Sequence, residues 1–62
     1  MDEPILKFFA YVHLPMPLRA VSERFHDLAF VLAQSLPPSE ERTAALRKLL
    51  ESKDAAVRAA LP

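Results

Sequence analysis

The fold is decided by residues 32–46, which read LAQSLPPSEERTAAL and place two adjacent prolines between two helix-forming segments. Each proline pushes the residue before it out of the helical region, so a first helix must end near Leu36. Ser39 follows and is a suitable N-cap, because its hydroxyl can accept a hydrogen bond from a free amide of the first turn. The two glutamates after it place negative charge where the helix dipole favours it. We therefore predict that a second helix spans 39–61.

Apolar residues recur at helical spacing on both sides of this turn. Upstream, steps of three and four residues form one continuous stripe, which consists of Leu18, Val21, Phe25, Leu28, Leu32 and Leu36 and is widened by Ala29. Downstream, the matching stripe consists of Leu46, Leu49, Leu50, Val57, Ala60 and Leu61. Such stripes indicate amphipathic helices, here over 17–36 and 39–61. Because a short Pro-Pro turn joins them, we expect an antiparallel hairpin.

The N-terminal segment 4–14 is apolar nearly all round. We expect a short helix up to about Ala10 and an irregular segment through His13. A segment of this kind is not stable alone in water, so it must pack on the hairpin or on a neighbouring chain. The predicted architecture is all-α: one helical-hairpin domain over 1–62, with a short N-terminal helix or arm followed by the two-helix hairpin.

The composition excludes several classes of protein. Eight Lys and Arg balance eight Asp and Glu, so the chain has no net charge. Neutrality argues against a binder of DNA or RNA polymers and against a polybasic membrane peptide. Cys and Gly are both absent, which excludes disulfides, thiolate metal sites and glycine-rich phosphate loops. Because no apolar run could cross a membrane and no secretory signal is recognisable, we expect a cytoplasmic protein.

The small size of the chain predicts association. A core of this length rarely supplies more than about 3–5 kcal/mol, and oligomerisation is the usual remedy when disulfides and metals are absent. Phe30 and Val31 point away from the upstream stripe, and we interpret them as an oligomer contact, with packing beneath the N-terminal segment as the alternative. Arg42 and Lys53 project toward the apolar side of the second helix. They either cover the edges of the stripe or face an anion in a cleft between chains.

A few residues could carry chemistry. Tyr11 and His13 could stack a base and hydrogen-bond a phosphate, although the residues alone favour Tyr11 as a core residue with a satisfied hydroxyl. His26 flanks the upstream stripe, and the two histidines have no third ligand at metal spacing, so we expect no metal and no cofactor. Ser22 lies four residues before His26, but a helical hairpin has no deep, dry pocket to organise a transition state. We therefore do not expect an enzyme.

Four short motifs together resemble a known family. They are YVHLP at 11–15, RFHDLA at 24–29, PSEERTAALRKLLE at 38–51 and DAAVRA at 54–59. With these motifs, which cover the chain from about residue 8 to about residue 60, the sequence resembles the phage anti-CBASS cyclic-nucleotide sponges. The resemblance implies a hexamer of small helical hairpins. It also implies that cyclic di- or trinucleotide messengers are bound between the chains and are not cleaved.

The resemblance also implies roles for individual residues. Tyr11 stands where the family has a base-stacking tyrosine, and His26 stands where it has a ligand-contacting lysine. This is a departure, because lysine is a fixed cation at pH 7 whereas histidine is mostly neutral. Arg58 is the candidate for an arginine that holds cyclic trinucleotides at a separate site.

The residues and the resemblance together predict a phage immune-evasion protein of the host cytoplasm that sequesters cyclic oligonucleotides. Tyr11 would stack a base, and His13, Arg24 and His26 would make polar and phosphate contacts. The alternative is a small helical interaction or oligomerisation module with no small-molecule ligand. A third hypothesis is a hydrolase built on Ser22 and His26.

Overall fold

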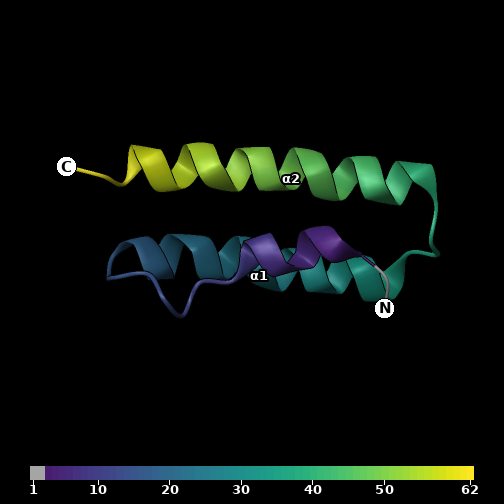
Figure 1. Ribbon diagram of the computed structural model, residues 1–62, viewed down its shortest axis with the longest axis horizontal. Helices are drawn as coiled ribbons and strands as arrows, with labels where there is room; N and C mark the ends of the chain where they lie inside the picture. Colours follow the sequence, from purple (N-terminus) through teal and green to yellow (C-terminus); the bar gives the residue numbers. More distant parts are fainter. Residues whose placement is uncertain (1–2) are drawn as a thin grey trace.

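The computed structural model describes residues 3–62, so the first two residues of the expected domain lie outside the described part. The chain forms a 3₁₀ helix η1 (Pro4–Phe9) and two α-helices, α1 (Leu18–Ser35) and α2 (Glu40–Ala59). Helices α1 and α2 lie side by side and antiparallel, and η1 contacts both of them (Figure 1). Residues 3–62 contain no strand. The prediction of an all-α chain with two packed helices is confirmed.

Local sequence explains where the two long helices begin and end. Leu36 is extended, with φ −103° and ψ 140°, because Pro37 follows it and disfavours the helical region. The Ser39 side chain accepts a hydrogen bond from the backbone amide of Arg42 at 3.0 Å, which satisfies one of the free donors of α2. The predicted N-cap is therefore confirmed. Helix α2 ends near Ala60, shortly before the terminal proline.

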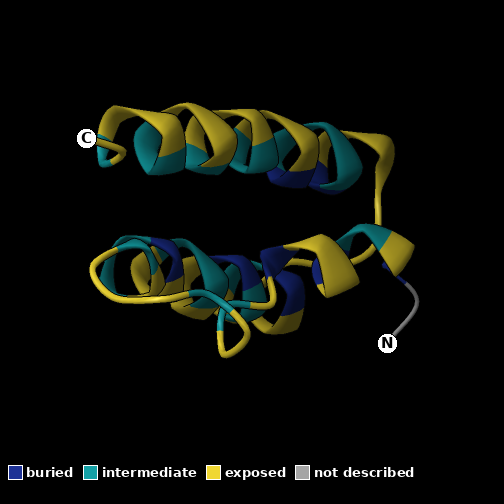
Figure 2. Cartoon of the chain, turned by 60° about the vertical axis from the view of Figure 1, so that its left-hand side comes forward, coloured by how far each residue is buried: buried dark blue, intermediate teal, exposed yellow. Residues whose placement is uncertain are grey.

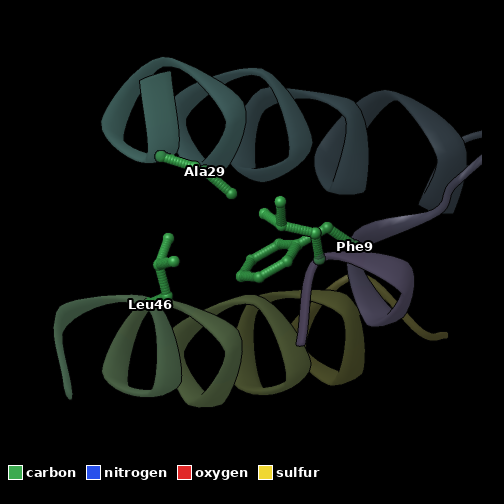
Figure 3. Packing of buried hydrophobic residues seen from close by; sticks show 5 residues of the cluster. Phe9, Ala29 and Leu46 are labelled. Atoms are coloured by element: carbon green, nitrogen blue, oxygen red, sulfur yellow. The ribbon is translucent and has the colours of Figure 1, made fainter. Parts of the chain in front are cut away.

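The core lies where the three helical elements meet. It contains two residues of η1, two of α1 and one of α2, which are Leu6, Phe9, Ala29, Ala33 and Leu46. In Figure 3 the ring of Phe9 lies in the space between the two long helices, beside Ala29 and Leu46. Figure 2 shows the same arrangement for the whole chain, with buried positions on the sides where the elements face one another. The N-terminal segment thus contributes the largest side chain of the core.

The buried face of α1 differs from the predicted stripe. Its buried residues are Ser22, Ala29 and Ala33, of which only Ala29 belongs to the predicted stripe. Phe25 and Leu32 of the stripe pack partly buried against the core, whereas Leu28 and Leu36 are exposed. The reason is that η1 packs against this helix, and only small residues leave room for its aromatic ring. The centre of burial is therefore turned away from the leucines, toward the side of α1 that carries His26 and Phe30.

The stripe of α2 is closer to the prediction. Leu46 is buried, Leu49 and Leu50 pack partly buried against the core, and Leu61 is exposed beyond the end of the helix. The outer sides of both long helices face solvent (Figure 2). None of the described helices is long and apolar enough to cross a membrane.

Candidate functional site

Arg42 is buried at the junction of the three segments. Its side chain is 6% exposed, and its Nε donates a hydrogen bond to Glu3 Oε2 at 2.9 Å. Its Nη1 donates to the carbonyl oxygens of Ala33 at 2.8 Å and Leu36 at 3.0 Å. These are carbonyls at the end of α1 that have no partner within the helix. Arg42 therefore closes the C-terminus of α1 and ties the N-terminal segment to it.

This position corrects the prediction for Arg42. The sequence predicts that Arg42 covers the edge of an apolar stripe or faces an anion between chains. Instead, its guanidinium is enclosed and paired within one chain. Thr43 Oγ1 also donates to Glu3 Oε2, at 3.3 Å. Lys53 lies farther along α2, and its Nζ is 3.0 Å from Asp54 Oδ1.

Three aromatic rings stack where the N-terminal segment crosses α1. The rings of Tyr11 and His26 meet edge to face, with centroids 4.9 Å apart and planes at 69°. His26 and Phe30, one helical turn apart, have centroids 4.4 Å apart and planes at 35°. His26 Nδ1 lies 3.0 Å from Asp27 Oδ1. This aromatic cluster of Tyr11, His26 and Phe30 joins two segments that are far apart in the sequence.

Phe30 belongs to the aromatic cluster, whereas its neighbour Val31 does not. Phe30 is partly buried and packs against the core and against His26, which agrees with the alternative prediction of packing beneath the N-terminal segment. Val31 is 55% exposed. The two residues therefore do not form one surface.

A second group of functional side chains lines a groove of about 380 Å³. The groove lies between η1, the segment that follows it and the C-terminal half of α2. Its charged and aromatic lining residues are Lys7, Phe8, His13, Lys53, Asp54 and Arg58. Three fixed cations thus face one carboxylate, and we refer to this feature as the basic groove.

A larger groove of about 590 Å³ lies at the other end of the molecule. Its ionisable residues are Glu3, Glu40, Arg42 and Arg47, so its formal charge is zero. Glu3 and Arg42 are already paired with each other. This groove therefore has no net charge, whereas the lysines, arginine and aspartate of the basic groove sum to +2.

The predicted ligand residues fall into two pairs and one single residue. Tyr11 and His26 meet in the aromatic cluster, and His13 and Arg58 line the basic groove. Arg24 is exposed on α1 and forms no hydrogen bond or ion pair within residues 3–62. Sequence reasoning did not identify Lys7 or Phe8 as groove residues, because no periodicity relates η1 to the end of α2.

The Ser22 hydroxyl is fully buried and has no hydrogen-bond partner among residues 3–62, so no hydrogen bond joins it to His26, whose Nδ1 lies 3.0 Å from Asp27 Oδ1. Within residues 3–62, no three His, Cys, Asp or Glu side chains gather as a metal site would require.

Comparison of this chain with protein-family models, with curated proteins and with solved structures finds no match.

Proposed function

We propose that this chain binds a cyclic oligonucleotide messenger and sequesters it without cleaving it, as the phage anti-CBASS sponges do. The observation that carries the proposal is the contact between Tyr11 and His26. These are the two residues that the resemblance assigns to base stacking and to ligand contact. Fifteen positions apart in the sequence, they come together at 4.9 Å because the N-terminal segment folds back over α1.

The geometry of the aromatic cluster suits a base. A nucleobase that stacks on an aromatic side chain gains about 1–3 kcal/mol regardless of its identity. Tyr11 is held edge-on by His26, which in turn rests on Phe30. A ring that is already ordered loses less conformational entropy on binding, so more of the stacking energy remains as affinity.

Phosphate contacts are the second requirement. In the proposal they come from His13, Arg24 and Arg58, because charge-assisted hydrogen bonds to a phosphodiester are stronger than neutral ones. Arg24 does not line the basic groove, and it is absent from the aromatic cluster. The resemblance implies sites between chains. In a homo-oligomer, Arg24 of one chain could therefore reach the ligand that another chain holds. Sequestration needs no nucleophile, which is consistent with the isolated Ser22 hydroxyl.

The proposal is tested by titration calorimetry with a panel of cyclic di- and trinucleotides at physiological salt. Tyr11→Ala should weaken binding by about tenfold to a hundredfold through loss of base stacking, and Tyr11→Phe should retain most of the affinity. Val12→Ala, at the exposed neighbouring position, is the matched control and should bind like the unsubstituted protein. Each ligand should be recovered intact after the protein is denatured.

Two results would contradict this proposal. Absence of heat with every member of the panel would show that the chain does not bind these cyclic nucleotides. Recovery of a linearised ligand would replace it with the hydrolase hypothesis.

The alternative function, an interaction or oligomerisation module without a small ligand, is favoured by one surface. Leu28 and Val31 lie one helical turn apart on the outer side of α1 and are 46% and 55% exposed. Adjacent exposed aliphatic residues on so small a chain are typical of a contact with another protein. The two functions differ in one measurement, because only the first predicts heat on addition of a cyclic nucleotide.

A further inference from the structure

The basic groove concentrates positive charge in a chain that has none overall. Three of the eight Lys and Arg residues, Lys7, Lys53 and Arg58, line it together with the single carboxylate of Asp54. Its formal charge is therefore +2 while His13 is neutral. The residues come from η1, from the segment after it and from α2, so folding of one chain is sufficient to assemble the groove.

The charges of the groove are poorly compensated. Lys53 is the most enclosed of them, with a side chain that is 13% exposed, and its partner is the adjacent and half-exposed Asp54. Burial of an ammonium group is unfavourable unless the charge is paired. Arg58 forms no hydrogen bond or ion pair from its side chain within residues 3–62, and Lys7 Nζ lies 5.2 Å from the centroid of the Phe8 ring. The dipole of α2 favours Arg58 in its last turn, but it does not account for Lys7.

We infer that the basic groove binds a phosphate dianion, with a phosphomonoester such as a nucleoside 5′-monophosphate as the ligand. A phosphomonoester carries a charge of about −1.5 to −2 at pH 7, which matches the formal charge of the groove, whereas one phosphodiester carries a single charge. Arg58 can bind two phosphate oxygens through its planar fork, and the lysines supply point charges.

The volume of the groove and the position of Phe8 further restrict the class of ligand that it could bind. The groove volume of about 380 Å³ lies near the lower end of the range for small-molecule sites. Phe8 lines it and is 55% exposed, and Lys7 Nζ lies over its ring, 5.2 Å from the centroid. A base can stack on the part of the ring that Lys7 leaves exposed. A compact ester with one planar group fits these features better than a bare polyphosphate.

This inference does not depend on the proposed function. The phosphate site lies within one chain. It shares His13 and Arg58 with the proposed function but uses neither Tyr11 nor His26. It also concerns a dianion rather than a cyclic diester. Tyr11→Ala should therefore leave this binding unchanged, so that the two proposals can fail separately.

The test compares ligands of one base and different charge. Binding of AMP, 3′,5′-cyclic AMP and inorganic phosphate is measured by calorimetry or chemical-shift titration at constant ionic strength. AMP should bind about tenfold or more tightly than cyclic AMP, because only its phosphate is a dianion. Tighter binding of AMP than of inorganic phosphate identifies a nucleotide as the ligand, and equal binding identifies the phosphate group alone.

Variants locate the site. Arg58→Gln should weaken AMP binding by about tenfold or more through loss of two charge-assisted contacts, and Lys7→Gln should weaken it in the same direction. Arg47→Gln makes the same change of charge on α2 outside the basic groove and should alter the affinity by less than about threefold, because salt screens distant surface charges. Circular dichroism confirms that each variant is folded.

Three results would overturn the inference. Absence of AMP binding excludes the site. Equal affinities for AMP and cyclic AMP exclude selection of a dianion. Equal losses in the Arg58 and Arg47 variants show general attraction to a charged surface rather than a binding site.

Discussion

At the scale of single residues, Arg42 has the largest number of roles in this fold. Its guanidinium binds one carboxylate and two backbone carbonyls, and its backbone amide is capped by Ser39. A buried ion pair is not by itself a source of stability, since desolvation offsets the attraction. Here Nε donates to the carboxylate and Nη1 donates to two backbone carbonyls, so these donors keep hydrogen bonds although the charge is enclosed.

We predict that Arg42→Ala is strongly destabilising. It leaves the carboxylate of Glu3 buried without its partner and the last carbonyls of α1 unsatisfied, and loss of one member of a buried pair costs about 3–5 kcal/mol. A domain of this size has little more stability than that, so the variant should be largely unfolded at room temperature. Thermal and urea unfolding followed by circular dichroism measure the effect.

Two further variants serve as references for Arg42→Ala. Glu3→Gln keeps an acceptor oxygen and should be less harmful. Arg47→Ala, at an exposed position on the same helix, should change the stability by less than about 0.5 kcal/mol. A stable Arg42→Ala protein would show that the buried pair contributes little.

The sequence predicts the role of Ser39 but not that of Arg42. The cap depends on residues within one helical turn, and its pattern is visible in the printed sequence. The partner of Arg42 is 39 positions away, and no spacing rule connects them. Helical periodicity alone places Arg42 on the apolar side of α2, and the structure shows that this side is polar at its beginning because Glu3 lies there.

At the scale of elements, η1 determines how the hairpin packs. A 3₁₀ helix of six residues has no independent stability, yet it supplies Leu6 and Phe9 to a core of five buried apolar residues. Helix α1 has small residues, Ala29 and Ala33, where η1 packs against it. Phe9 fills the space that Ala29 and Ala33 leave between the two long helices (Figure 3).

We predict that Phe9→Ala is far more harmful than Phe8→Ala. Phe9 is completely buried, and truncation of a buried phenylalanine costs about 3–5 kcal/mol through lost burial and the cavity that remains. Phe8 is exposed at the next position of the same helix, so its truncation should cost less than about 1 kcal/mol. Urea unfolding of the two variants provides the comparison, and similar losses would mean that η1 is not part of the core.

The existence of the two long helices is predictable from the sequence, whereas their rotation is not. Prolines and periodicity locate α1 and α2 because both signals are local. The buried face of α1 depends on what packs against it, and the leucine stripe takes no account of η1. A ring from another segment favours alanine and serine at the centre of the contact, which a search for large apolar residues overlooks.

At the scale of the whole molecule, the shape leaves little interior. The radius of gyration is 11.7 Å, and the extents are 38 × 18 × 16 Å. A compact chain of this length would have a radius of about 10.6 Å. An elongated hairpin has more surface for each buried residue, and several large apolar side chains remain exposed. Both features favour association with further copies of the chain.

We predict that the protein is a homo-oligomer held in part by the outer side of α1. Val31→Glu places a charge on this exposed surface, which should reduce the mass measured by light scattering by dissociating the oligomer. Ser52→Glu adds the same charge at an exposed position of α2 and should leave the mass unchanged. A monomeric mass for the unsubstituted protein would remove the basis for sites between chains.

The candidate sites are predictable from the sequence only in part. Tyr11, His13, His26 and Arg58 attract notice because of their chemistry and their place in the motifs. The division of these residues between an aromatic cluster and a basic groove depends on the path of the segment after η1, which no local pattern specifies. The presence of Lys7 and Phe8 in the basic groove also depends on this path.

The hydrogen bonds of Arg42 also suggest the order in which the chain folds. Those to Leu36 and Ala33 close loops of six and nine residues, whereas the one to Glu3 closes a loop of 39. Since the entropy cost of loop closure rises with loop length, the turn between the long helices forms early and the N-terminal segment docks last. A fusion tag at the amino-terminal end should therefore slow the final folding step, in which the N-terminal segment docks. A tag after Pro62 should not affect that step.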